Sequence, residues 1–320
     1  SQLKAAIPDS TLRQHILELK PDIVHLNDKA CMQAGVSLKN CKIPIVQHIR
    51  SSYFPTYAPF VKWSSIFCIR KYANTLIAIS EDETDGFMHD KRLSIIFNTV
   101  NLAETEQAIA EKGTIRSAWG IKETEIVIGY AANISGVKGA WDFLNMAIAL
   151  CERYPDNPFR FVMAGTLPYP SANPGRLVKW GLKKMEAPAD LLNTFQSHPL
   201  LKEKLFVLGF QKEILPLIAA MDILVVCTRL GVLGRQPFEA MAVKTPVVVT
   251  SGHTGKSSII LHDKTGLVAP MKDIDGLVNA VDRLIFNTAL RGFLVKNAYQ
   301  YALTSFNPEV NSDKVIMLYQ

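Results

Sequence analysis

Short runs of β-branched and other apolar residues recur along the chain, and longer amphipathic segments separate them. Nearly continuous apolar strands are typical of sheets that are buried on both faces, and helices between such strands give parallel connections. The pattern therefore predicts an α/β protein with mainly parallel sheets covered on both faces, whose ligands bind beyond the carboxyl ends of the strands. The candidate strands are 22–26, 43–47, 75–79, 93–97, 125–131, 160–164, 205–208, 223–227 and 246–250.

The strand candidates form two series, which predicts two domains. At 320 residues the chain exceeds the size at which one core usually stops growing. A polar, helix-like segment over 104–119 separates the two series. We therefore expect an N-terminal domain over 1–112 and a C-terminal domain over 113–300. Helices in the second series are expected over about 141–153, 212–221, 236–243 and 274–287.

The charge balance allows anionic partners without requiring nucleic acid. Lys and Arg number 35 against 29 Asp and Glu, a net charge of +6 that is spread along the chain. No pattern of aromatic and basic residues indicates nucleic-acid binding. One Pro-rich and then basic stretch contains Arg176, Lys179, Lys183 and Lys184. It is either a basic amphipathic helix that contacts an anionic membrane or a solvated surface insertion.

Cysteine usage and hydropathy indicate the compartment. The five cysteines are widely spaced and form no C-x-x-C pair, so neither a disulfide framework nor a zinc site is expected. No apolar run approaches the roughly 18 residues of a membrane span, and no leader-like segment opens the chain. We expect a cytoplasmic protein without a metal cofactor, and peripheral contact with the inner face of the membrane stays open as an alternative.

The strongest local signal lies between Gly231 and Val268. Gly231 and Gly234 form a loop that leads into a helix carrying Glu239, and a buried strand follows. Glycine allows a ligand to approach the backbone closely, and the amides of a helix N-terminus favour phosphate. A carboxylate such as Glu239 can accept hydrogen bonds from two sugar hydroxyls. The segment therefore suits a ligand made of a diphosphate and ribose or hexose.

A second glycine loop, S-G-H-T-G-K-S-S, follows this strand at 251–258. Lys256 and His253 lie within it, and Lys256 and Arg235 would add positive charge near a phosphate. The loop has two residues between its glycines where a P-loop has four, so we reject nucleotide hydrolysis.

Further motifs follow in an order and spacing that resemble the retaining glycosyltransferases of family 4, which have the GT-B fold. The resemblance implies two Rossmann-like domains facing a cleft, and a C-terminal helix over 301–320 that returns to the first domain. The first part of the acceptor domain would be absent or altered, because the chain begins at a helix that precedes a mid-domain strand of the family. The motifs are PDIVHLND, IPIVQHIRSSY, LIAISED, IFNTVN, GYAANISGVKGAWDFL, VMAG, FVLGF, AAMDILVVCT, FEAMAVKTPVV and TGLV.

The resemblance also implies roles for individual residues. Lys138 would hold the donor diphosphate, Glu239 would contact the ribose, and His48 would lie beside the reacting sugar; these three are the expected catalytic residues. His25 is interpreted as structural. The remaining expected donor-binding residues are Asn133, Gly136, Gly209, Phe210, Gly234, Arg235, Gly252, Thr254 and Gly255.

The sequence departs from the family at three donor-binding positions. Gly231 stands where the family has the first glutamate of its E-x7-E pair, and Asn133 stands where it has an arginine. Ser257 or Ser258 replaces a glutamate. Losing the arginine would remove about 2–3 kcal/mol of charge-assisted hydrogen bonding. Arg229 and Arg235 are the candidates to replace it.

The resemblance implies transfer of a hexosyl unit from a UDP- or GDP-sugar to a glycan or lipid-linked acceptor, with retained configuration, in cell-surface polysaccharide or glycolipid synthesis. Two alternatives stay open. One is a catalytically impaired binding or partner subunit, favoured by Gly231 and Asn133. The other is a sugar-nucleotide epimerase of the same fold.

Overall fold

The computed structural model describes residues 6–51, 59–84, 86–167, 189–229, 233–252, 257 and 259–320. The chain forms two compact units. Unit 1 comprises Ser1–Asn98 and Pro308–Gln320, and unit 2 comprises Thr99–Asn307. The units thus divide after Asn98, whereas the sequence placed the boundary at 112/113. The polar segment belongs to unit 2 because α5 (Leu102–Ala110) and α6 (Lys112–Ala118) pack on α10 (Leu215–Ala220).

Unit 1 is built on a four-stranded parallel sheet of order β1-β2-β3-β4. On one face, α3 (Met32–Leu38) and α4 (Pro59–Tyr72) bury apolar strand residues, and α2 (Ser10–Glu18) packs on α3. On the other face, Val315 and Leu318, in and just after α14 (Pro308–Met317), pack near Val46 and Ile77. The strands are β1 (Val24–Asn27), β2 (Ile45–Ile49), β3 (Thr75–Ala78) and β4 (Leu93–Ile95).

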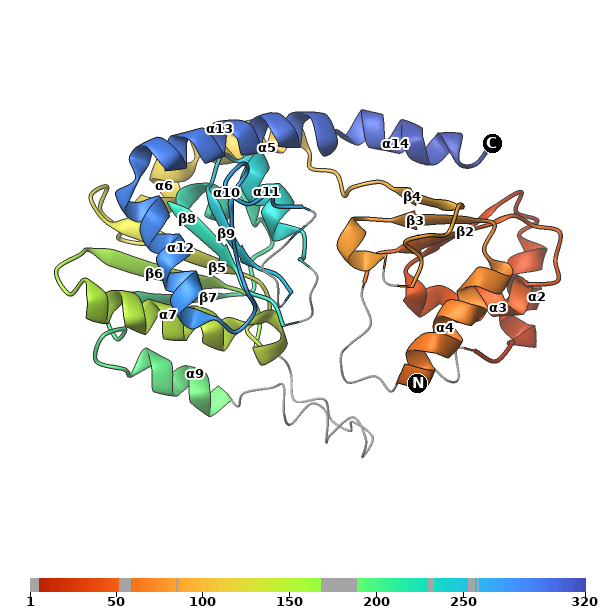
Figure 1. Ribbon diagram of the computed structural model, residues 1–320, viewed down its shortest axis with the longest axis horizontal. Coiled ribbons are helices and arrows are strands. Elements are labelled where there is room, and N and C mark those ends of the chain that lie inside the picture. Colours follow the sequence, from red (N-terminus) through yellow and green to blue (C-terminus); the bar gives the residue numbers. More distant parts are fainter. Residues whose placement is uncertain are drawn as a thin grey trace. The chain divides into compact units, whose positions relative to one another are not determined.

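Unit 2 is built on a six-stranded parallel sheet of order β10-β9-β8-β5-β6-β7. The helices α7, α9 and α12 share one core with the strands, whereas α10 and α11 pack together with α5, α6 and α13 (Figure 1). The strands are β5 (Ile126–Ala131), β6 (Phe159–Ala164), β7 (Leu205–Gly209), β8 (Ile223–Val226), β9 (Val247–Thr250) and β10 (Leu267–Ala269). The helices not yet bounded are α7 (Ala140–Arg153), α9 (Ala189–Gln196), α11 (Gln236–Ala242), α12 (Ile274–Phe286) and α13 (Thr288–Ser305).

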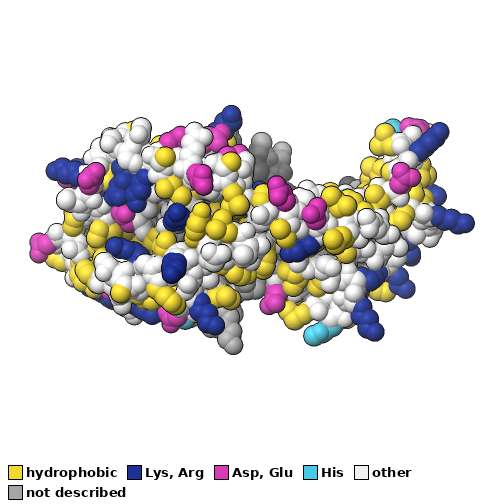
Figure 2. Space-filling view, turned by 90° about the horizontal axis from the view of Figure 1, so that it is seen from above, with side chains coloured by type: hydrophobic (Ala, Val, Ile, Leu, Met, Phe, Trp, Pro, Cys, Tyr) yellow, Lys and Arg dark blue, Asp and Glu magenta, His cyan; other side chains and the backbone are white. Residues whose placement is uncertain are grey.

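Every predicted strand is present, and its bounds differ from the prediction by at most two residues. The four predicted helices of the second series are also present, as α7, α10, α11 and α12. Short 3₁₀ turns follow several strands, among them Glu81–Glu83, where Ser80 caps the acidic run. Basic side chains stand at many separate points of the face drawn in Figure 2, in keeping with the modest net charge.

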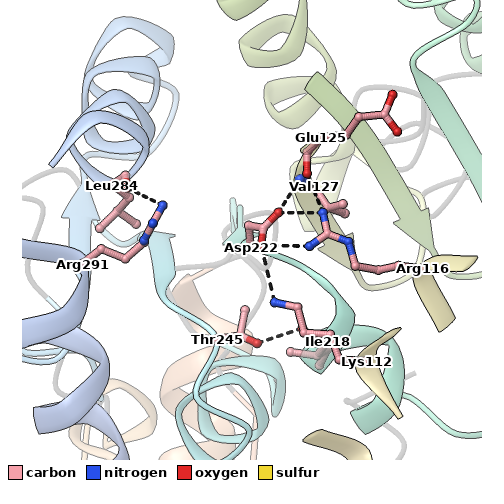
Figure 3. A network of polar contacts seen from close by, with 9 residues as sticks. All are labelled: Lys112, Arg116, Glu125, Val127, Ile218, Asp222, Thr245, Leu284 and Arg291. Atoms are coloured by element: carbon pink, nitrogen blue, oxygen red, sulfur yellow. Dashed lines mark hydrogen bonds and ion pairs between the residues drawn. The ribbon is translucent and has the colours of Figure 1, made fainter. Parts of the chain in front are cut away.

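The amino ends of β5 and β8 are joined by a network around Asp222 (Figure 3). Its carboxylate accepts two hydrogen bonds from the Arg116 guanidinium, at 3.2 and 3.0 Å, and a third from the backbone N–H of Val127, at 2.8 Å. The Lys112 amine lies 3.4 Å from the same carboxylate. At this end of the sheet, charged side chains therefore stabilise the packing of strands and helices.

Among the described residues, none of the helices combines the length and the apolar character that crossing a bilayer requires.

Candidate active site

A short loop after β5 is fixed by a buried tyrosine. The Tyr130 hydroxyl lies 2.8 Å from the carbonyl oxygen of Asn133 and 3.2 Å from that of Lys138, and it donates to them. Gly139 follows with φ of 69°, and a Cβ there would collide with the Cβ of Cys227, just after β8. Only glycine meets both conditions. Lys138 is thereby held at a set place, directly before the long helix α7.

Lys138 is half-buried, and its amine has no hydrogen-bond or ion-pair partner in the described part of the chain. Burial lowers the pKa of this amine from its usual value, because water no longer solvates the charged form fully. An incoming anion would relieve that cost, and the positive end of α7 favours negative charge at the same place. The arrangement suits a phosphate group.

Asn133 and Gly136 belong to the same loop. Asn133 is exposed, and its side-chain oxygen accepts a hydrogen bond from the Thr166 hydroxyl at 3.0 Å. Gly136 is buried and opens the short 3₁₀ turn that ends at Lys138. The position of the family's arginine is therefore occupied by a neutral amide.

Arg229 is committed to a structural contact. Its guanidinium binds the buried carboxylate of Asp142 through two hydrogen bonds, at 3.0 and 2.6 Å. This contact raises the pKa of Arg229 above its usual value. The backbone N–H of Arg229 also donates to the carbonyl of Val137, at 3.0 Å, which joins the β8 loop to the β5 loop. Of the two candidates to replace the arginine, Arg235 remains.

Glu239 lies in α11, directly after the loop that contains Gly234 and Arg235. Its side chain is only 12% exposed, whereas that of Arg235 is 57% exposed, and the two approach to 3.5 Å. Burial raises the pKa of Glu239, and the guanidinium of Arg235 opposes that rise. Arg235 also donates to the carbonyl of Thr99 across a long 3.5 Å. Glu239 is thus a largely buried carboxylate with spare capacity to accept hydrogen bonds from hydroxyls.

Two further glycines mark the ends of neighbouring strands. Gly209 ends β7 with φ of 69°, its carbonyl accepts from the N–H of Gly165, and the exposed Phe210 follows. Gly252 follows β9 with φ of 50°, and its carbonyl accepts from the N–H of Met271. The expected Thr254 and Gly255 lie outside the described residues, as do Gly231, His253, Lys256 and Ser258. Ser257 is described, and its hydroxyl accepts from the backbone N–H groups of Ile259 and Ile260.

Unit 2 thus gathers its predicted donor residues at one edge of the sheet. The residues after β5 are Asn133, Gly136 and Lys138, and those at the end of β7 are Gly209 and Phe210. Gly252 follows β9, and the connection after β8 carries Gly234, Arg235 and Glu239. In parallel strands these are all carboxyl ends, where α/β sheets bind ligands. Among the described residues, no group of three or more His, Cys, Asp or Glu side chains could hold a metal ion.

His48 lies in unit 1, near the carboxyl end of β2, within a chain of polar contacts. Its Nδ1 is 3.3 Å from Nε2 of His25, whose Nδ1 is 2.6 Å from the Tyr319 hydroxyl. Burial, followed by the charges of His25 and Arg50, lowers the pKa of His48 to about 4. His48 is therefore neutral near pH 7. Its Nε2 is buried, and no described residue hydrogen-bonds to it.

The proton positions in this series of hydrogen bonds can be assigned from the donor and acceptor strengths of the three side chains. A phenol is a better donor than an imidazole, and an imidazole nitrogen is a better acceptor than a phenol oxygen. We therefore assign the Tyr319 hydroxyl as donor to His25, and His25 Nε2–H as donor to His48. The remaining hydrogen of His48 then lies on Nε2 and is available to an acceptor oxygen. Sequence reasoning missed Tyr319, because a contact across 294 positions leaves no local pattern.

Comparisons with known proteins identify a family. The pattern that defines the family Glycosyl transferases group 1 matches residues 111–301, more than half of the chain. The chain belongs to this family.

Among its relatives is the UDP-Gal:alpha-D-GlcNAc-diphosphoundecaprenol alpha-1,3-galactosyltransferase of Escherichia coli. It is 22% identical over 313 residues, which cover 94% of this chain and 75% of the relative. The alpha-D-kanosaminyltransferase of Streptomyces kanamyceticus is 24% identical over 299 residues, 87% of this chain and 70% of the relative.

Solved structures show the same fold. Anabaena Alr3699/HepE in complex with UDP matches 95% of this chain and 80% of its own, with a TM-score of 0.77 and 18% identity. The sucrose-phosphate synthase of Thermosynechococcus elongatus matches 96% of this chain and 75% of its own, with a TM-score of 0.74 and 18% identity. The predicted GT-B fold, with two Rossmann-like α/β units, is confirmed.

Proposed function

We propose that this glycosyltransferase moves a hexosyl unit from a nucleotide diphosphate sugar to an acceptor hydroxyl, with retention of the anomeric configuration. The observation that carries the proposal is Lys138, a half-buried amine without a partner in the described part of the chain, at the carboxyl edge of the six-stranded sheet. A partly desolvated cation at this place suits a departing diphosphate.

The other residues proposed to bind the nucleotide sugar lie around the same edge of the sheet. Glu239 accepts hydrogen bonds from the ribose hydroxyls, and Arg235 turns from Glu239 toward the phosphates. Gly209 and Phe210 line the base pocket, and the loop with Gly252, Thr254 and Gly255 offers backbone amides. UDP is the favoured nucleotide, because the Escherichia coli relative is named for UDP-Gal and the Anabaena structure contains UDP.

The reaction needs no protein nucleophile. The bond between the anomeric carbon and the diphosphate oxygen breaks, and Lys138 stabilises the charge that develops on that oxygen. The acceptor hydroxyl attacks from the same face, and its proton passes to the leaving phosphate oxygen. Neutral His48 donates from Nε2 to an oxygen of the transferred sugar.

The acceptor is proposed to be a glycan or a lipid-linked sugar, in cell-surface polysaccharide or glycolipid synthesis at the cytoplasmic side of a membrane. The name of the Escherichia coli relative, with its diphosphoundecaprenol-linked acceptor, supports this class. The basic segment with Lys183 and Lys184, which the sequence left open between a membrane contact and a solvated surface insertion, lies outside the described residues.

The test is a turnover assay with UDP-galactose, UDP-glucose and GDP-mannose, each with and without a lipid-diphosphate-linked N-acetylglucosamine. We expect nucleotide release that depends on the acceptor, and a product whose new linkage is α by NMR. A β linkage would contradict retention. Nucleotide release that is independent of acceptor would indicate the epimerase instead.

A catalytically impaired partner subunit is the second candidate. The observation that favours it is the loss of one cation: Asn133 is neutral, and Arg229 is held by Asp142. Calorimetric titration separates the two functions. Micromolar binding of a nucleotide sugar without turnover on any acceptor supports the partner subunit, whereas turnover excludes it.

A further inference from the structure

Helix α4 of unit 1 exposes a stripe of large aromatic rings. Phe60, Trp63 and Phe67 are 72%, 70% and 59% exposed, and their spacing of three and four residues places them on one side of the helix. The opposite side buries Ile66 and Ile69 in the core of the unit. Scattered exposed apolar residues are ordinary, but three aromatic rings in one stripe mark a surface that contacts something else.

The segment of sequence that contains this stripe carries charge of one sign, although Asp90, from farther along the chain, lies 3.8 Å from Arg70. Between residues 29 and 80 the sequence contains seven Lys and Arg residues and no Asp or Glu. At the end of α4 the stripe is continued by the exposed Arg70 and Lys71. The Lys71 amine lies 5.4 Å from the centre of the Phe67 ring, so that the charge and the rings form one surface.

A basic hollow adjoins the end of the stripe. It has a volume of about 430 Å³, and Lys39, Lys42 and Lys71 line it together with Asn74. None of these three lysines forms an ion pair with a described residue. The hollow therefore offers several amines without ion-pair partners among the described residues to an anionic group, next to exposed aromatic rings.

This composition distinguishes between partners. A glycan platform places carboxylates or amides beside its aromatic rings, because sugar hydroxyls need hydrogen-bond partners. The exposed residues of α4 are Pro59, the three aromatic residues, Arg70 and Lys71, and they include neither an acid nor an amide. Aromatic rings beside lysine and arginine are typical of helices that lie in the interface of an anionic bilayer.

We propose that the exposed face of α4 and the adjoining lysine hollow dock unit 1 on an anionic lipid bilayer. Phe60, Trp63 and Phe67 enter the headgroup region, and the lysines bind lipid phosphates. The proposal deepens the lipid-linked acceptor of the proposed function, because it gives the membrane side of that acceptor a defined place on unit 1. Docking itself requires neither donor nor turnover.

The test is co-sedimentation of the full chain with vesicles of phosphatidylglycerol and phosphatidylcholine in equal amounts, compared with vesicles of phosphatidylcholine alone. We expect binding to the anionic vesicles that salt weakens. The double variant Trp63→Ser, Phe67→Ser is expected to bind about tenfold more weakly or worse. Lys39→Gln and Lys71→Gln are each expected to bind about fivefold more weakly. The matched control is Phe293→Ser on α13, whose ring is 53% exposed and whose loss is expected to leave binding unchanged.

A second measurement reports on Trp63 itself. The wild-type fluorescence is expected to shift to the blue on adding anionic vesicles and to be quenched by brominated lipid, and Trp63→Phe is expected to remove both effects. Equal vesicle binding by the double variant and the wild type would overturn the proposal. So would loss of binding only in Lys183→Glu, Lys184→Glu, or loss of affinity for a free oligosaccharide with vesicle binding intact.

The two proposals fail differently. If the docking proposal fails, the α4 variants sediment like the wild type, while turnover on a water-soluble acceptor continues. If the transfer proposal fails, no acceptor is glycosylated, while vesicle binding persists.

Discussion

The two ends of the six-stranded sheet in unit 2 use charge in opposite ways. At the amino end, Asp222 is surrounded by Arg116, Lys112 and the N–H of Val127, so that each charge meets its complement (Figure 3). At the carboxyl end, Lys138 has no partner among the described residues, and Glu239 meets only the half-exposed Arg235. At the carboxyl end the Arg229–Asp142 pair is structural in this sense, whereas Lys138 and Glu239 keep capacity for the ligand of the proposed function.

This difference has a physical basis in solvation. Removing one partner of a buried ion pair leaves the other charge desolvated and unpaired, which costs several kcal/mol. A charge that is already unpaired has no such partner to lose. Substitutions at the amino end should therefore change stability, and substitutions at the carboxyl end should change ligand binding and rate.

The largest effect is expected for Lys138→Met. Turnover should fall by about 10²- to 10³-fold, because a preorganised charge at the leaving group is lost. The melting temperature should stay the same or rise, since a desolvated amine is replaced by an apolar side chain. Measurement of kcat and of thermal unfolding checks both expectations.

Lys112→Met is the matched control at the amino end. It should leave kcat unchanged and lower stability slightly, because the Lys112 side chain is partly exposed where it meets Asp222. If both lysine variants lose stability and neither loses turnover, the division between the two ends is wrong.

The next effect is expected for Asp222→Asn. The free energy of unfolding should fall by about 3 kcal/mol, because the Arg116 guanidinium, only 10% exposed, loses its counterion. Urea unfolding measures the change. Calorimetry should find the same Kd for the nucleotide sugar as in the wild type. A larger Kd at unchanged stability would contradict the structural role of this network.

Glu239→Gln should weaken donor binding by about tenfold, because a charged acceptor of ribose hydrogen bonds is replaced by a neutral one. Its melting temperature should be close to that of the wild type. Glu125→Gln is the control, since Glu125 pairs with Arg160 at 2.6 Å near the amino end of β5. This control should lose stability and keep its affinity; the reverse result would assign Glu239 to structure.

The smallest effect extends the comparison to unit 1. At the amino end of β4, Asp90 is paired with Arg92 at 2.8 Å, and this contact lowers the pKa of Asp90. Near the carboxyl end of β2, burial lowers the pKa of His48 from 6.5 to about 4. Between pH 6.5 and 4 the unfolded chain therefore binds a proton that folded His48 does not, so stability should fall as the pH falls through this window.

The measurement is the free energy of unfolding against pH for the wild type and for His48→Gln. On acidification, the free energy of unfolding of the variant should fall by about 1 kcal/mol less than that of the wild type. The difference is this small because solvent screening reduces the effect of a half-buried group. NMR titration of the His48 ring checks the pKa directly. A midpoint near 6.5 would show that burial and the charges of His25 and Arg50 do not lower the pKa of His48.

The sequence predicted the parts of the fold that have a local signature. Apolar strands, the helices between them and the glycine positions follow from short patterns, which is why 223–227 and 246–250 were recognised as buried strands. The expected donor-binding residues were assigned from motif order, and their roles stay a prediction. The domain boundary differs from the prediction because the polar helices α5 and α6 have an apolar side that packs on α10, and the polar composition hides this side.

The contacts that position the site had no such signature. The Asp142 carboxylate binds Arg229 across 87 positions, and Tyr130 binds two backbone carbonyls of a loop. Such contacts depend on how strands and helices are placed in space. Burial and hydrogen bonding therefore reveal them, whereas periodicity does not.

The Tyr130 contact has a thermodynamic consequence. The hydroxyl contacts the backbone at both ends of the 133–138 loop, and these contacts restrict the conformations that the loop can adopt. Little conformational entropy is then lost there on binding, and the affinity for diphosphate depends mainly on charge and desolvation. In the proposed function, Tyr130 would therefore help to fix the phosphate side of the site through its contacts with two backbone carbonyls.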